Sequence, residues 1–176
     1  MASADSSTGE SPAPHGAEDG RRRVVIEGVQ PEIDGGRFPI KRTVGETVTV
    51  QADVFADGHD QIAALLLYRR DGEFQWHKAP MAPLANDRWQ AVFEVTELGA
   101  WLYTVEGRID HFATWLKDLE KKFAAGQDLE TDRRIGAGLI EEAAPRAGAD
   151  DAERLRTWAA GLRDAGDDAT ALSRAR

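Results

Sequence analysis

Residues 47–54 read TVTVQADV, and every second position from Val48 to Val54 is apolar while the positions between them are polar. Successive side chains of a β-strand point to opposite faces, so this alternation predicts a strand with one buried and one solvated face. Residues 88–95 (RWQAVFEV) repeat the pattern. Two such segments indicate antiparallel strands that cover a common core.

The sequence on either side adds four candidate strands, at residues 24–29, 62–68, 73–77 and 101–106. Residues 62–68 (IAALLLY) are apolar on both faces, which is typical of a central strand covered on both sides. Asp71-Gly72 is a pair typical of a type I′ hairpin turn. Strands without intervening helical patterns predict an immunoglobulin-like antiparallel β-sandwich over residues 23–109.

After Ile109 the apolar residues recur with the period of a helix. The first predicted helix ends near Gly126, and its apolar stripe consists of Phe112, Trp115, Leu116, Leu119 and Phe123. A second helix is expected over about residues 128–144. Gly136 and Gly138 weaken it by about 1 kcal/mol each relative to Ala.

A third helix is expected after Pro145, where Asp150 and Glu153 have the spacing of a capping box. Residues 167–176 can begin a fourth helix but show no apolar stripe. Residues 110–176 therefore predict a helical hairpin or bundle of about three helices. The chain as a whole is expected to belong to the α+β class, with the sandwich first and the helices second.

Residues 1–22 are rich in Ser, Ala, Gly, Pro and acidic residues and predict a disordered tail. The complete chain has 22 Lys and Arg against 31 Asp and Glu, a net charge of −9. This balance argues against nucleic acid and anionic membrane surfaces as partners, because both are polyanions. The sequence has no run of 18 apolar residues, no signal-peptide pattern and no cysteine, which favours a cytoplasmic protein.

Motifs for phosphate, metal or nucleophile chemistry, such as the P-loop, HExxH and GxSxG, do not occur in the sequence, so it predicts no cofactor and no metal. The most polar cluster contains Asp57, His59 and Asp60. These side chains suit either a cation or a simple turn stabilised by Asp. Arg37 and Lys41 suit either an anionic group or the protection of a strand edge from pairing.

The sequence contains five tryptophans. Four of them fall on predicted apolar faces, which favours packing: Trp89, Trp101, Trp115 and Trp158. Trp76 is the exception, because packing and a surface role are equally compatible with its position beside His77. An exposed tryptophan can stack on a sugar ring, with polar neighbours such as Asp87 adding hydrogen bonds.

Four segments of the sandwich region carry a more specific signal: VVIEGVQPEIDGGRFPIKRTVGETVTVQADVFADGHD (24–60), LLLYRR (65–70), WHKAPM (76–81) and NDRWQAVFEV (86–95). Together with DHFATWLKDLEKKFAAGQD (110–128), they strongly resemble the N-terminal region of the bacterial maltose-1-phosphate maltosyltransferases. These are retaining enzymes of the α-amylase superfamily that extend α-1,4-glucan from maltosyl phosphate. The resemblance runs from about Arg22 to about Ala143.

The resemblance implies a β-sandwich with an inserted helical domain, both contributing to a homodimer. In that family the chain returns to the sandwich after the helices and continues into a catalytic barrel, which holds the catalytic carboxylates. This sequence ends at Arg176, so the helical insert is expected to be incomplete, the barrel to be missing and the chain alone to be inactive. The resemblance therefore assigns no catalytic residue here.

Two functional hypotheses follow. The first is a non-catalytic N-terminal part of such an enzyme, which serves assembly with the barrel and dimerisation. The alternative is a stand-alone α-glucan-binding sandwich. The candidate interface or sugar-contact residues are Arg37, Lys41, Asp57, His59, Asp60, Trp76 and Asp87.

Overall fold

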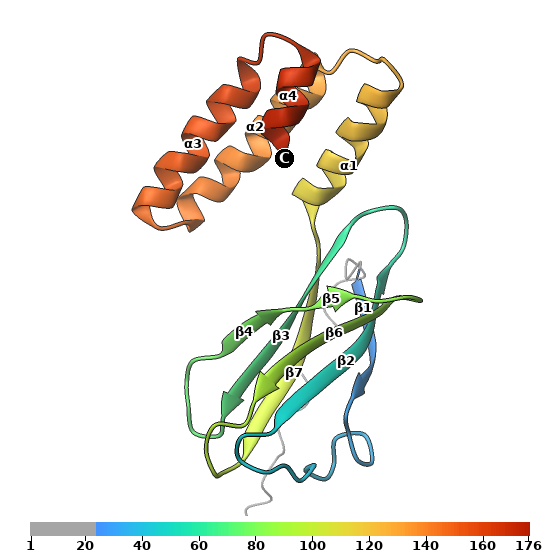
Figure 1. The fold of residues 1–176 in the computed structure, drawn as a ribbon, viewed down its shortest axis with the longest axis vertical. Coiled ribbons are helices and arrows are strands. Elements are labelled where there is room, and N and C mark those ends of the chain that lie inside the picture. Colours follow the sequence, from blue (N-terminus) through green and yellow to red (C-terminus); the bar gives the residue numbers. More distant parts are fainter. Residues whose placement is uncertain (1–23) are drawn as a thin grey trace, which may run out of the picture.

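Strands precede helices along the chain in the computed structural model, which describes residues 24–176 (Figure 1). The described strands lie between Val24 and Ile109, and the described helices lie between His111 and Ala175. The α+β class expected from the sequence is confirmed. The tail expected over residues 1–22 lies outside the described residues.

Two antiparallel sheets form the sandwich. One sheet has the order β1-β2-β6-β5 and consists of β1 (Val24–Gln30), β2 (Thr47–Ala56), β6 (Arg88–Glu94) and β5 (Ala82–Pro83). The other has the order β4-β3-β7 and consists of β4 (His77–Pro80), β3 (Ile62–Arg70) and β7 (Trp101–Ile109). Within the described chain β7 pairs with β3 alone, so its other edge is free.

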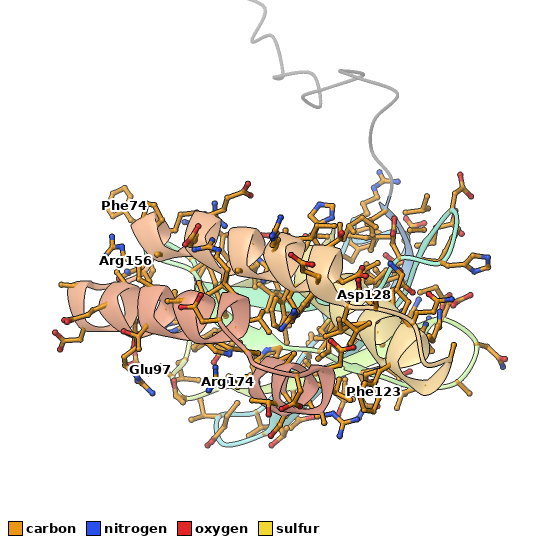
Figure 2. All side chains as sticks on the ribbon, turned by 90° about the horizontal axis from the view of Figure 1, so that it is seen from above. Phe74, Glu97, Phe123, Asp128, Arg156 and Arg174 are labelled. Atoms are coloured by element: carbon orange, nitrogen blue, oxygen red, sulfur yellow. The ribbon has the colours of Figure 1, made fainter. Side chains whose placement is uncertain are left out.

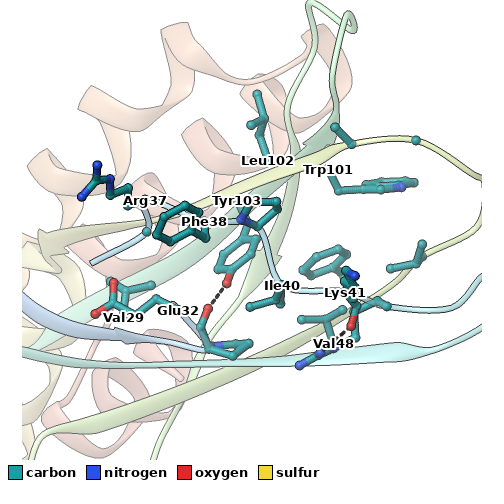
Figure 3. Close-up of a pocket in the computed structure, with 18 residues that line it drawn as sticks. Val29, Glu32, Arg37, Phe38, Ile40, Lys41, Val48, Trp101, Leu102 and Tyr103 are labelled. Carbon is teal, nitrogen blue, oxygen red and sulfur yellow. Dashed lines mark hydrogen bonds between the residues drawn. The ribbon is translucent and has the colours of Figure 1, made fainter. Parts of the chain in front are cut away.

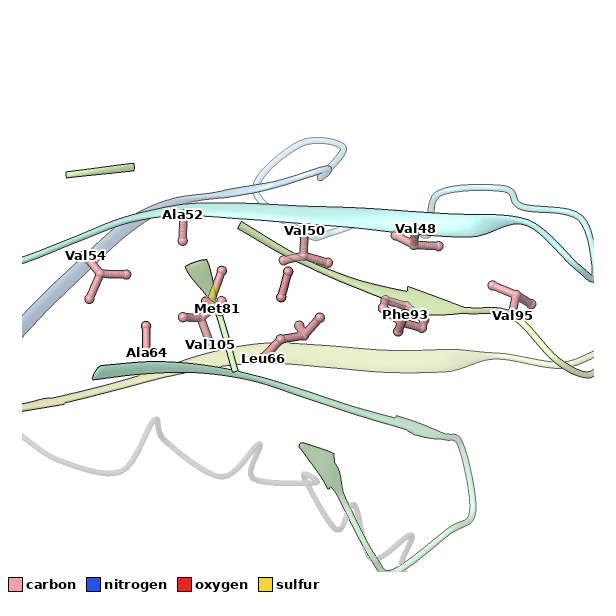
Figure 4. Packing of buried hydrophobic residues seen from close by; sticks show 11 residues of the cluster. Val48, Val50, Ala52, Val54, Ala64, Leu66, Met81, Phe93, Val95 and Val105 are labelled. Carbon is pink, nitrogen blue, oxygen red and sulfur yellow. The ribbon is translucent and has the colours of Figure 1, made fainter. Parts of the chain in front are cut away.

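The core of the sandwich lies between the two sheets (Figure 4). Alternate residues of β2 point into it, and Val48, Val50, Ala52 and Val54 are at most 2% exposed. The other buried members of this cluster are Ala64, Leu66, Met81, Ala91, Phe93, Val95 and Val105. The alternation predicted for residues 47–54 and 88–95 is confirmed, since both sets of apolar side chains meet in one core.

The strand predicted over residues 73–77 is wrong. Phe74 is 100% exposed and lies at the periphery of the molecule seen from above (Figure 2). The backbone N–H of Glu73 donates to the carbonyl of Arg70 at 3.2 Å, which closes a turn after β3 and delays the next strand until His77. The structure also adds β5, a two-residue strand that the sequence did not predict.

The strand predicted over residues 62–68 is the central strand of its sheet, as expected. Only its inner face is fully covered: Ala64 and Leu66 are buried, whereas Leu65 and Leu67 on the outer face are half-buried. The expectation that both faces are buried is therefore only half correct.

Four α-helices follow the sandwich: α1 (His111–Ala124), α2 (Glu130–Ala143), α3 (Ala149–Arg163) and α4 (Asp168–Ala175), with a 3-10 turn at Ala144–Arg146. Asp110 caps α1, because its side chain accepts a hydrogen bond from the backbone N–H of Ala113. Gly126 lies just beyond the end of α1 with a φ of 66°, as predicted.

The predicted capping box is wrong. Helix α3 begins at Ala149 after Gly148, and no side chain caps its N-terminus. Residues 167–176 do form a fourth helix with a buried face. Its cap is Asp167, which accepts a hydrogen bond from the backbone N–H of Thr170, and Ala171, Leu172 and Ala175 are buried.

The helices build a second hydrophobic cluster, which shares no residue with the first. Trp115 and Leu119 of α1 are buried in it, and the Phe112 ring lies 5.1 Å from Trp115 and 5.5 Å from Trp158. Phe123, at 37%, is the most exposed residue of the predicted α1 stripe. The other helices therefore cover most of this stripe.

Candidate functional site

A pocket of about 700 Å³ opens beside the free edge of β7 (Figure 3). Its walls are the 31–42 segment, inner-face residues of β2 and β6, and the first residues of β7. This volume lies within the range of about 300–1,000 Å³ typical of ligand pockets. The pocket combines apolar walls with charged groups.

The 31–42 segment forms one wall because it turns back on itself. Gly35 and Gly36 have φ values of 64° and 80°, a region that glycine enters without steric strain. The turn brings Ile33 opposite Phe38 in an isolated antiparallel bridge. Phe38 lines the pocket and remains 52% exposed.

Three aromatic rings form the opposite wall. The Phe93 ring lies 6.1 Å from Trp101 and 5.8 Å from Tyr103, measured between ring centroids. The indole N–H of Trp101 donates to the carbonyl of Glu97 at 3.2 Å. These contacts hold the rings in place, so the apolar wall is formed before any ligand or partner arrives.

Tyr103 ties this wall to the 31–42 segment. Its hydroxyl donates a hydrogen bond to the carbonyl oxygen of Pro31 (Figure 3). Burial raises the pKa of Tyr103 above the ordinary tyrosine value; Arg42 opposes this shift and Glu32 reinforces it. The hydroxyl therefore stays protonated, as a donor requires, beyond the pH at which a solvated tyrosine ionises.

Substituting Tyr103 by Phe should lower the free energy of unfolding by about 1 kcal/mol at neutral pH, because the Pro31 carbonyl loses its donor. Because the pKa of Tyr103 is raised in the folded state, its protonated hydroxyl contributes stability that is lost as the pH rises through the folded-state pKa. The parent should therefore lose stability in alkali, and Tyr103→Phe should lack this part of the loss. Urea unfolding below and above pH of about 10 tests both statements. The matched control is Tyr68→Phe, which keeps its stack on Phe93. Identical alkaline losses in parent and Tyr103→Phe would contradict the assignment.

Arg37 contributes positive charge to the rim of the pocket. Its guanidinium carbon lies 5.5 Å from the centre of the Phe38 ring, and one nitrogen lies 3.8 Å from the Asp34 carboxylate. Arg37 and Asp34 side chains are 75% and 61% exposed, so this ion pair adds little stability. The arginine remains available at the rim.

Lys41 and Arg42 extend this rim. Arg42 donates to the carbonyl of Lys41 at 2.8 Å and pairs with Glu46 at 3.3 Å. Among the described residues that line the pocket, Glu32 is the only acidic one. A cationic rim thus surrounds an apolar pocket in a chain whose net charge is −9.

The structure brings two of the candidate residues, Arg37 and Lys41, to this pocket. Asp57, His59 and Asp60 lie in the loop between β2 and β3, at the end of the sandwich nearest α1 (Figure 1). No group of three or more His, Cys, Asp or Glu that could hold a metal ion occurs among residues 24–176.

Trp76 and Asp87 lie elsewhere in the sandwich. The guanidinium carbon of Arg69 sits 4.5 Å from the centre of a Trp76 ring, so one face of the indole is already covered. Asp87 has a φ of 58° in the turn before β6, and its carbonyl accepts a hydrogen bond from Val54 at 2.9 Å. The seven candidates therefore do not form a single site.

The candidate residues from the sequence do not include three that line the pocket: Glu32, Phe38 and Tyr103. The signal for Phe38 was present, since a large aromatic residue follows Gly-Gly-Arg in a segment without strand periodicity. Tyr103 lies in the strand predicted over residues 101–106, and a strand pattern alone does not indicate a pocket. In the structure Tyr103 packs against the core and also lines the pocket, because the pocket opens onto the edge of the core.

Within residues 24–176, no helix is both long and apolar enough to cross a membrane.

Comparison with known proteins gives one consistent result. The family model described as α-1,4-glucan:maltose-1-phosphate maltosyltransferase, domain N/S, matches residues 22–176. A protein of that name from Chlorobaculum tepidum is 55% identical over 151 residues, covering 86% of this chain and 22% of the relative. Like-named proteins from Methylacidiphilum infernorum and Myxococcus xanthus are 43% and 44% identical, each over 70% of this chain and 19% of the relative. The chain thus spans about a fifth of the length of these relatives.

Proposed function

This chain belongs to the α-1,4-glucan:maltose-1-phosphate maltosyltransferase family, as its N/S domain, and on that premise we propose that it is a non-catalytic part of such an enzyme. Its role is assembly: it covers the catalytic barrel and contributes to a homodimer. The enzyme as a whole extends α-1,4-glucan from maltose 1-phosphate. The observation that carries the proposal is the family match, which includes both the sandwich and the helices.

The chemistry of the pocket supports a non-catalytic role. A retaining transfer between sugars needs two carboxyl groups about 5–5.5 Å apart, one as nucleophile and one as acid and base. Among the described residues that line the pocket, Glu32 is the only carboxylate, and the other charged groups are Arg37, Lys41 and Arg42. This arrangement can bind but lacks the second carboxylate of that mechanism.

The free edge of β7 supports a role in assembly. Unpaired N–H and C=O groups along a strand favour pairing with a further strand. The pocket beside this edge also exposes apolar surface, including Phe38 at 52% and Leu102 at 40%. The family resemblance implies a return of the polypeptide to the sandwich, and this edge and pocket are the surface that would receive it.

A direct test combines the chain with the remaining part of the Chlorobaculum tepidum relative, produced as a separate polypeptide. We expect the two to co-elute in gel filtration and to release phosphate from maltose 1-phosphate with a glucan acceptor. The chain alone should release none, and light scattering at micromolar concentration should show more than a monomer because its edge is open.

Phosphate release by the chain alone would refute the non-catalytic role. A strictly monomeric chain that also fails to bind the remaining part would refute the assembly role. Quenching of tryptophan fluorescence by maltooligosaccharides, in the absence of any such assembly, would favour the alternative of a stand-alone glucan-binding sandwich.

A further inference from the structure

The helical part is joined to the sandwich at a very short junction. Strand β7 ends at Ile109 and helix α1 begins at His111, so Asp110 alone separates them. The two hydrophobic clusters share no residue, and shared core packing therefore does not fix how the helices stand on the sandwich. Hydrogen bonds at this junction connect the two parts directly.

Gln61, the residue before β3, contacts the junction with both of its backbone groups. Its carbonyl accepts a hydrogen bond from the backbone N–H of Asp110 at 2.8 Å, which extends the β3–β7 ladder beyond the Ile62–Ile109 pair. Its N–H donates to the side-chain oxygen of Thr114 at 2.8 Å. The second bond leaves the ladder and crosses from the sandwich to the first turn of α1.

The Thr114 hydroxyl is held on its other side as well. It donates to the carbonyl of Asp110 at 2.8 Å, while the Asp110 carboxylate accepts from the N–H of Ala113 at 2.9 Å. A hydroxyl can donate once and accept in addition, so a single Thr114 oxygen serves both neighbours. Thr114 and Gln61 are partly buried, which limits the replacement of these bonds by water.

We propose that Thr114 is a positioning residue that locks the direction of α1, and with it the whole helical part, against the end of the sandwich at Gln61. Helix α1 packs into the second cluster through Trp115 and Leu119, so the other helices follow its direction. Its 14 residues span about 20 Å, so a tilt of about 15° at the junction displaces its far end by about 5 Å. A partner that contacts both parts at once would then meet a surface formed in advance.

The absence of cysteine from the sequence allows clean spin labelling at two introduced cysteines, T49C on the exposed face of β2 and R156C on exposed α3. Double electron–electron resonance then measures the distance between the two parts. In T114V, which keeps the shape but removes the hydroxyl, we expect the distance distribution to broaden or shift by about 5 Å. Amide exchange at Gln61 should accelerate in the same variant, because its acceptor is gone.

T114S restores the hydroxyl and should retain the parent distribution. T170V is the matched control, because it removes a first-turn hydroxyl that bonds Asp167 at 2.9 Å within the helical part. T114A also removes the hydroxyl, but alanine favours the helix. If the distance between the labels changes in both T114V and T114A while the helical circular dichroism stays the same, the change is not caused by unfolding of α1. Parent-like distances and unchanged Gln61 exchange in T114A would overturn the proposal. This outcome is independent of whether the chain assembles with a catalytic barrel.

Discussion

Replacing Gly136 by alanine is expected to lower the free energy of unfolding of the helical part by about 1–3 kcal/mol, the usual range for an overpacked core. A Cβ atom at this position would lie 2.1 Å from Cζ2 of Trp115 and 2.4 Å from Cε2. The indole has little room to retreat, since Trp115 is 7% exposed and its N–H donates to the carbonyl of Asp132 at 2.8 Å. Urea unfolding followed by helical circular dichroism measures the change.

The same helix supplies the control. Gly138 has nothing within 4 Å of an added Cβ, so Gly138→Ala should stabilise by about 0.5–1 kcal/mol through helix propensity alone. Opposite signs for two glycines two residues apart would identify packing, rather than propensity, as the cause. Stabilisation by both substitutions would show that the Trp115 ring can move aside.

Trp89→Ala should destabilise the sandwich by about 3 kcal/mol, the lower end of the range for removing a large aromatic side chain from a core. Trp89 is only half-buried, but it packs against the sandwich cluster and its indole N–H donates to the carbonyl of Val54 at 3.0 Å. The substitution therefore removes a packed ring and leaves an acceptor without its donor. Urea midpoints read by near-ultraviolet circular dichroism report the loss.

Trp76→Ala is the comparison for this variant. Its indole contacts the Arg69 guanidinium at 4.5 Å and lies outside both hydrophobic clusters, so a loss of about 0.5–1 kcal/mol is expected. If the Trp89→Ala and parent midpoints coincide, Trp89 is not a packing residue, and a role in stacking on a sugar ring gains support.

Sequence periodicity predicted the sandwich well where one face of a strand is fully buried. The β2 pattern was decisive, because a shift of one residue in strand register would have turned Val50 and the other buried alternate residues of β2 to the solvent. The same criterion failed for residues 73–77, where alternation continues but Phe74 is fully exposed in a turn. Alternation records side-chain direction only if the segment pairs with another strand, and β4 starts pairing at His77.

The helices show a second kind of failure. Helix α4 buries Ala171 and Ala175 beside Leu172, and alanines do not stand out as an apolar stripe in a sequence rich in alanine. The apolar stripe of α1 was recognised in the sequence, but the residues that pack against it were not. They lie on other helices, α2 and α4, and periodicity reports only on the helix in which it occurs. Gly136 illustrates the point: it appeared as a weak position in a helix, whereas it makes room for Trp115.

The sequence did not predict the pocket itself. Arg37 and Lys41 were singled out as residues that suit either an anionic group or the protection of a strand edge. Phe93, Trp101 and Tyr103 followed the strand pattern and predicted only a core. Their second role depends on which edge of the sandwich is open, and that depends on strand order rather than on local sequence.

The separation of the two hydrophobic clusters has an evolutionary consequence. Substitutions at distant sites without shared partners act additively, so a change beside Leu66 needs no compensating change beside Leu119. Each part can accumulate neutral replacements at its own rate. At the junction Gln61 contributes only backbone atoms to these bonds, so we expect replacement of the Thr114 side chain to be tolerated less than replacement of the Gln61 side chain.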